Sequence, residues 1–114
     1  MTERTERIFC PLKGKWHRLI KMRRKTWEFR DAKSPVARQI LRLRGDLPLS
    51  VELRRGYTGQ SLWATVDRIV EFPDPFKIPK RILDAGCVRP DVLQTLFDHR
   101  PLVAFHFKLT GVRS

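Results

Sequence analysis

The clearest strand pattern in the chain runs from residue 47 to residue 72 and reads LPLSVELRRGYTGQSLWATVDRIVEF. Its first part, Leu47 to Leu53, places apolar residues at every second position, which is the period of a strand with one buried face. A second β-rich run follows from Leu62 to Phe72, and the loop between the two runs contains Gly56 and Gly59. Two such runs joined by a glycine-containing loop predict a β-hairpin at the centre of the sheet.

Upstream of this hairpin, residues 7–30 favour a short meander of strands. Residues 7–12 alternate in polarity, and Pro11 argues for an edge strand because proline cannot donate to a central ladder. Residues 15–22 are ambiguous, since their apolar positions fit either one face of a helix or one face of a strand. Residues 27–29 place two aromatic side chains one residue apart, which favours a strand.

Short helices flank the hairpin on both sides. Residues 34–45 begin with Ser-Pro, a good N-cap followed by a residue suited to the first helical position. Residues 78–85 and 90–97 predict two further helices, and residues 102–109 predict a final strand that inserts into the sheet. The expected fold is therefore one small α+β domain over residues 1–114, with an antiparallel sheet of meander, hairpin and C-terminal strand and about three short helices.

The chain is strongly basic, and the charge is concentrated in its first half. It has 114 residues with 24 Lys or Arg against 12 Asp or Glu, a net charge of +12 and a pI near 10.9. Residues 1–55 hold 16 of the 24 cationic side chains. A positive field of this size favours a polyanionic partner, and nucleic acid is the commonest one.

Other features bear on the compartment and on the ends of the chain. No stretch approaches the roughly 20 apolar residues of a membrane span, and the charged residues 1–7 do not resemble a secretory signal. We therefore expect a cytoplasmic protein with no membrane partner, with residues 1–6 frayed. Cys10 and Cys87 are then expected to be reduced, buried thiols.

The most informative stretch for function is residues 13–44, KGKWHRLIKMRRKTWEFRDAKSPVARQILRLR, in which cations alternate with large apolar groups. Lysine and arginine neutralise phosphates, and aromatic rings stack on unpaired bases. Two arginines and a tyrosine in the hairpin loop form a second candidate contact. The candidate nucleic-acid-binding residues are Lys13, Lys15, Trp16, Arg18, Lys21, Arg23, Arg24, Lys25, Trp27, Arg30, Lys33, Arg38, Arg42, Arg44, Arg54, Arg55 and Tyr57.

These observations predict a non-enzymatic nucleic-acid-binding protein that acts as a subunit or accessory factor of a nucleoprotein assembly. RNA is somewhat favoured over DNA as its ligand. We expect no metal, cofactor or small-molecule substrate, because the spacing of cysteine and histidine matches no metal motif. One alternative is a protein-binding inhibitor or regulator that docks its basic face on an acidic or nucleic-acid-binding surface of a larger complex. Another is a small metal-independent ribonuclease using His17, His99 and His106. A helix-turn-helix over residues 78–97 is a weaker alternative, because its second helix offers few base-reaching side chains.

Overall fold

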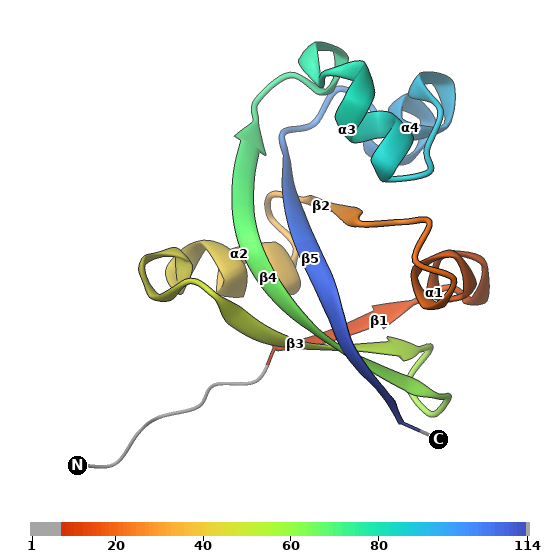
Figure 1. Ribbon diagram of the computed structural model, residues 1–114. Helices are drawn as coiled ribbons and strands as arrows, with labels where there is room; N and C mark the ends of the chain where they lie inside the picture. Colours follow the sequence, from red (N-terminus) through yellow and green to blue (C-terminus); the bar gives the residue numbers. More distant parts are fainter. Residues whose placement is uncertain (1–7, 114) are drawn as a thin grey trace.

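The computed structural model describes residues 8–113, so the expectation for residues 1–6 lies outside the described part of the chain. Five strands form one curled sheet in the order β1-β3-β4-β5-β2 (Figure 1). β1 is parallel to β3, and the other neighbouring strands are antiparallel. The α+β fold expected from the sequence is confirmed. The strands are β1 (Ile8–Leu12), β2 (Trp27–Asp31), β3 (Leu49–Arg55), β4 (Ser61–Phe72) and β5 (Leu102–Arg113).

In residues 8–113, four α-helices and two short 3₁₀ turns accompany the sheet. Figure 1 shows α1 and α2 far apart, at opposite ends of the curled sheet, with α3 and α4 together beyond one end of β4 and β5. Among the described residues, no helix is long and apolar enough to cross a membrane. The helices are α1 (Gly14–Lys21), α2 (Pro35–Arg42), α3 (Lys80–Ala85) and α4 (Pro90–Phe97), and the 3₁₀ turns are η1 (Arg44–Asp46) and η2 (Pro75–Lys77).

The meander expected over residues 7–30 is wrong in its middle part, because residues 14–21 form the helix α1. His17 and Ile20 lie three residues apart on its buried side, so the helical period prevails over the strand period. β1 and β2 consequently do not pair. β1 instead pairs with β3 in parallel, and the segment between them supplies the long crossover that a parallel pair requires.

The helix α2 and the central hairpin follow the sequence closely. The Ser34 hydroxyl accepts a hydrogen bond from the Ala37 backbone N–H at 3.2 Å, and Pro35 occupies the first helical position. β3 and β4 pair in antiparallel register from Leu49↔Val66 to Arg54↔Ser61. The Pro11 strand, β1, is an edge strand of the sheet, as its proline indicated.

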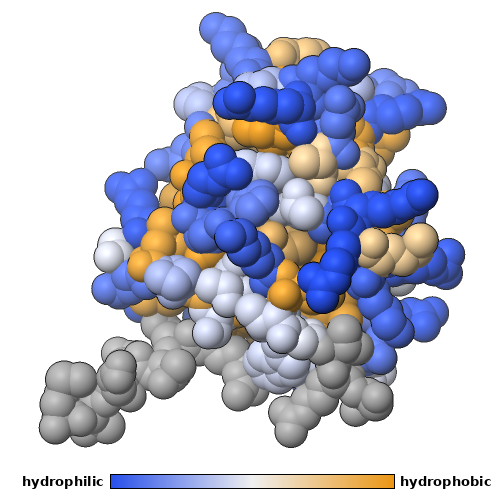
Figure 2. Space-filling view, in the orientation of Figure 1, coloured by the Kyte–Doolittle hydropathy of each residue, from blue (hydrophilic) through white to orange (hydrophobic). Residues whose placement is uncertain are grey.

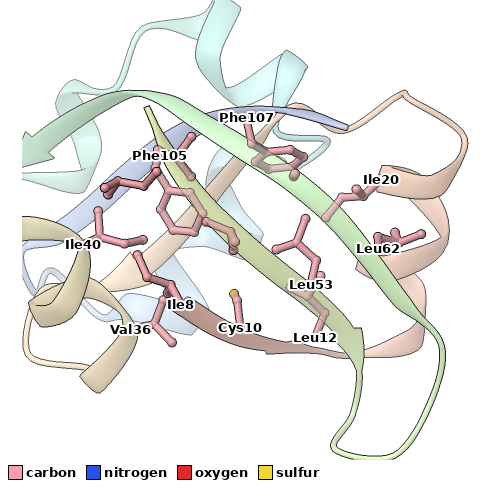
Figure 3. Packing of buried hydrophobic residues seen from close by; sticks show 14 residues of the cluster. Ile8, Cys10, Leu12, Ile20, Val36, Ile40, Leu53, Leu62, Phe105 and Phe107 are labelled. Carbon is pink, nitrogen blue, oxygen red and sulfur yellow. The ribbon is translucent and has the colours of Figure 1, made fainter. Parts of the chain in front are cut away.

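Buried side chains form two clusters on the two faces of the sheet. The first lies inside the curl, where Ile8 and Cys10 on β1 face Phe105 and side chains from α1 and α2 (Figure 3). The second lies between the opposite face and the α3–α4 pair, and it includes Trp27 and Leu93. The curl brings the two edge strands, β1 and β2, close to each other, and the candidate functional site lies where they meet.

Candidate functional site

Arg30 on β2 bridges the seam between the two edge strands. Its Nη2 donates to the Pro11 carbonyl oxygen on β1 at 2.6 Å and contacts the Cys10 sulfur at 3.0 Å. Its Nε donates to Glu28 Oε2 at 3.0 Å. One side chain therefore joins two strands that share no backbone ladder, and it holds the Glu28 carboxylate at the seam.

Lys25 completes a buried cluster of three charged side chains at this seam. The Lys25 ammonium donates to the Gly86 carbonyl oxygen at 2.5 Å and lies 3.4 Å from Glu28 Oε1. The Lys25 side chain is 2% exposed, that of Glu28 8% and that of Arg30 21%. The cluster combines two cations with one carboxylate, so it carries a net positive charge in a poorly hydrated place.

Burial has opposite effects on two ionisable groups at the seam. It lowers the pKa of Lys25, while the neighbouring Glu28 carboxylate acts in the opposite direction. Burial also raises the pKa of the Cys10 thiol to about 12, even though the nearby Arg30 charge opposes this. Cys10 is therefore an unreactive structural thiol, whereas Lys25 is an ammonium whose charged form is disfavoured by its surroundings.

A cavity of about 260 Å³ opens directly onto this cluster. The Trp16 indole from α1 and the Phe29 ring from β2 form aromatic walls, and Leu96, 46% exposed, lies at the rim. Gly86 is required beside it, since a Cβ there would stand 2.4 Å from the Phe29 ring. The complete lining is Pro11, Leu12, Lys13, Trp16, Lys25, Glu28, Phe29, Arg30, Val88, Leu93, Leu96 and Phe97. We call this the seam cavity.

Exposed cations gather on and beside α1, and one of them, Lys13, also lines the seam cavity. Figure 2 shows hydrophilic side chains gathered over this part of the molecule, with apolar patches between them. The ammonium of Lys15 lies 4.7 Å from the centroid of the Trp16 ring. Arg55 from β3 joins this group, because it lines a depression of about 160 Å³ together with Arg18 and Lys21. The exposed predicted residues of this group are Lys13, Lys15, Arg18, Lys21, Arg23, Arg24 and Arg55.

The remaining predicted residues lie elsewhere. α2 does not extend the basic surface of α1, because the two helices stand at opposite ends of the curled sheet (Figure 1). The predicted cations on or beside α2 are Lys33, Arg38, Arg42 and Arg44. In the β3–β4 loop, Tyr57 is 74% exposed, whereas Arg54 is held by Glu52 and by Ser61 Oγ. The predicted set is therefore divided among three places.

Three predictions about individual side chains need correction. Lys25 is a buried group rather than an exposed cation of the turn, because the Gly86 carbonyl and Glu28 enclose it. Trp27, 5% exposed, packs in the second core cluster and offers no open face for stacking. Cys87 is only partly buried, and its thiol donates to the Arg24 carbonyl oxygen at 3.4 Å. Both cysteines are free, as expected.

The three histidines do not converge on one site. His17 is buried and hydrogen-bonded to the Gln60 carbonyl oxygen at 2.8 Å, while His99 packs against Phe76 beyond α4. His106 lies on β5 and pairs with Asp67. A ribonuclease that uses all three imidazoles together is thus not supported. Within residues 8–113, no three potential metal ligands gather either.

Sequence reasoning missed Glu28 and the apolar wall from α4. The signal was present in Glu28, one of few carboxylates in the basic stretch, which stands two residues before Arg30 in a predicted strand. Residues two apart in a strand share a face, so an acid there implies an internal ion pair. No comparable local signal places Leu93 and Phe97 opposite Trp16, since their proximity depends on the tertiary fold.

No protein-family sequence model and no curated protein sequence matches this chain. Its structure is similar to that of ASCH from Zymomonas mobilis, with a TM-score of 0.71 and 16% identity over 92% of this chain and 68% of that one. It is also similar to protein EF3133 from Enterococcus faecalis V583, assigned to family DUF984, with a TM-score of 0.60 and 11% identity over 83% and 66% of the two chains. At these identities the likeness shows the fold alone, and the fold of this chain is that of the Z. mobilis ASCH protein.

Proposed function

We propose that this protein binds single-stranded nucleic acid by taking an unpaired base into the seam cavity, and that it prefers RNA to DNA. The exposed cations around α1 hold the phosphate backbone outside the cavity. The observation that carries this proposal is the buried cluster of Lys25, Glu28 and Arg30 on an aromatic-walled cavity. In this role the protein serves as a subunit or accessory factor of a nucleoprotein assembly, and it leaves the ligand chemically unchanged.

The buried charges support a binding role because they are an inefficient way to stabilise a fold. Removing ions from water is costly, and well-packed apolar groups often serve stability as well or better. Buried charges with shifted pKa values that border a cavity are instead typical of functional sites. Arg30 uses Nε and Nη2 within the cluster, and no described residue accepts a hydrogen bond from its Nη1. That donor is suited to a base carbonyl or ring nitrogen.

The dimensions and walls of the cavity suit one base. Pockets for drug-sized ligands are commonly about 300–1,000 Å³, and the seam cavity is smaller, at about 260 Å³. Its walls are mostly apolar, and the Lys25, Glu28 and Arg30 cluster supplies polar groups at the seam, which suits a flat ring with hydrogen-bonding edges. Binding of unpaired bases by aromatic and cationic side chains is the usual mode for single strands.

The first test is fluorescence anisotropy with labelled single-stranded and duplex RNA and DNA across a series of salt concentrations. We expect binding of single strands that survives physiological salt, with a log–log salt slope that corresponds to several phosphate contacts. A denaturing gel after each titration should show intact RNA. Weak binding to every probe that vanishes at physiological salt would contradict the proposal and would assign the basic face to a protein partner.

Variants then distinguish the contribution of the seam cavity to affinity from that of the surface cations. Leu96→Trp should fill the mouth of the cavity from an exposed position and lower single-strand affinity about tenfold, since stacking is worth about 1–3 kcal/mol per base. Its salt slope should stay unchanged. The double variant Arg23→Gln, Arg24→Gln should lower the slope of log affinity against log salt, because two phosphate contacts are lost. Arg38→Gln on α2 removes a cation outside the site and is the matched control. Unchanged affinity in Leu96→Trp would exclude the cavity.

A further inference from the structure

A β-bulge in β4 builds a second cluster of polar side chains outside the seam cavity. The register with β5 pairs Val66 with Phe107 and Arg68 with His106, so Asp67 is the extra residue. Bulges of this kind redirect a side chain and are frequent beside functional sites. Here the bulge allows the Asp67 carboxylate to reach His106 Nδ1 at 2.6 Å.

The pairing with Asp67 fixes which nitrogen of His106 carries the proton. Burial of Asp67 acts to raise its pKa, but the hydrogen bond from His106 opposes this, and the pKa of Asp67 is lowered. Asp67 is therefore an acceptor, and Nδ1 is the donor nitrogen. In the neutral ring, Nε2 is then a hydrogen-bond acceptor. Trp27, in edge-to-face contact at 5.3 Å between ring centroids, restrains the ring.

His106 Nε2 is available to a ligand. No described residue forms a hydrogen bond with Nε2, and no buried side-chain nitrogen or oxygen in the described part of the chain lacks a partner. The free nitrogen must therefore reach solvent. His106 also lines a depression of about 400 Å³ that is bordered by the cations Arg23, Lys25 and Lys108. An acceptor nitrogen can receive a hydrogen bond from a hydroxyl group, and the surrounding cations can bind a phosphate. The depression therefore suits a ligand in which a hydroxyl group stands next to a phosphate.

Lys25 connects this depression to the seam cavity, because it lines both. A nucleic-acid strand whose base enters the seam cavity can thus pass its sugar and phosphate over the turn at residues 23–26. The only hydroxyl that stands beside a phosphate within such a strand is the ribose 2′-hydroxyl. This group allows a protein to distinguish RNA from DNA.

We propose that His106, oriented by Asp67, accepts a hydrogen bond from a ribose 2′-hydroxyl and so makes this protein selective for RNA. Lys108 and Arg23 contact the adjacent phosphate and contribute equally to RNA and DNA. The inference rests on the proposed function, since it assigns the sugar preference of the same bound strand. A DNA strand lacks the 2′-hydroxyl and would leave Nε2 without a hydrogen-bond partner in the complex. An unpaired polar group of this kind is the usual reason why a protein binds a ligand that lacks a hydroxyl more weakly.

The experiment compares RNA, DNA and 2′-O-methyl RNA of one sequence in the anisotropy assay. Wild-type protein should bind RNA about tenfold more tightly than the other two, as expected for one hydrogen bond lost with its donor. His106→Phe keeps an aromatic ring against Trp27 but lacks the acceptor, so it should bind all three probes equally. Asp67→Asn should do the same, because an amide that donates to Nδ1 moves the ring proton to Nε2. Melting curves establish that each variant is folded.

Lys108→Gln is the matched control, and it should weaken RNA and DNA binding by the same factor. Equal affinity of the wild type for RNA and DNA, or an RNA preference that persists in His106→Phe, would overturn the ribose assignment while leaving the proposed function intact. Failure of the wild type to bind either strand would overturn both.

Discussion

Glu28-Phe29-Arg30 on β2 and Glu52-Leu53-Arg54 on β3 share one local pattern with different consequences. In each, a buried glutamate accepts a hydrogen bond from the arginine two residues later on the same face of the strand. β3 lies between β1 and β4, and there the Ser61 hydroxyl also donates to Glu52 at 2.6 Å. β2 is an edge strand, and its pair borders the seam cavity.

The position of such a pair in the sheet determines what surrounds it. On β3, a neighbouring strand and the loop at Tyr57 enclose the pair, since Arg54 also donates to the Tyr57 carbonyl oxygen at 3.1 Å. On β2, the edge strand of the described sheet, Arg30 spans the gap to β1 and borders the seam cavity. We therefore regard the β3 pair as structural and the β2 pair as the candidate functional pair.

The largest expected difference is in stability. Glu28→Ala leaves the buried Lys25 and Arg30 charges uncompensated and should cost about 3–5 kcal/mol in the free energy of unfolding. Glu52→Ala should cost less, about 1–3 kcal/mol, because Arg54 is one-third exposed and can turn into water. Urea denaturation of the two variants measures both values. Equal losses would remove the distinction between the two pairs.

A smaller effect should appear in the reactivity of Cys10. Burial raises its pKa to about 12, and Arg30 lies over its sulfur. Arg30→Gln removes the positive charge that opposes this rise, so the thiolate fraction falls further and labelling by a small thiol reagent should slow about tenfold, the factor that corresponds to one lost contact of about 1.4 kcal/mol. Arg54→Gln, the matched change on β3, should leave the rate unchanged, and partly exposed Cys87 serves as the internal reference. Mass spectrometry follows each site, and identical Cys10 rates in the two variants would contradict the role of Arg30.

The smallest effect concerns the loop that encloses the β3 pair. Its residue Gln60 accepts a hydrogen bond from buried His17, and burial lowers the pKa of His17, although that hydrogen bond opposes the shift. The unfolded chain therefore binds a proton more readily, and the free energy of unfolding should fall as the pH drops from about 6.5 through the folded pKa. His17→Gln preserves a donor at a similar position and should remove this slope. A slope unchanged in that variant would point to another titrating group.

The strands, the cap of α2 and the position of β1 at the edge could be predicted from the sequence because each depends on local chemistry. The helix α1 could not be predicted, since the apolar positions of residues 15–22 fit both the helical and the strand period. Only the tertiary burial of Ile20 decides between the two. The same holds for Lys25, whose partner carbonyl at Gly86 lies 61 residues later. Charge density identified the basic region, but the pairing of Glu28 with its cations depends on the meeting of two strand edges.

The bridge from Arg30 to Pro11 also bears on how this protein behaves at high concentration. Exposed sheet edges are templates for pairing with other chains, and proteins protect them with prolines and charged side chains. Pro11 offers no N–H on β1, and the Arg30 guanidinium already occupies its carbonyl oxygen. Arg30 thus covers one of the pairing groups of the β1 edge, and the side chain that borders the seam cavity is expected to protect the sheet against edge-to-edge aggregation as well.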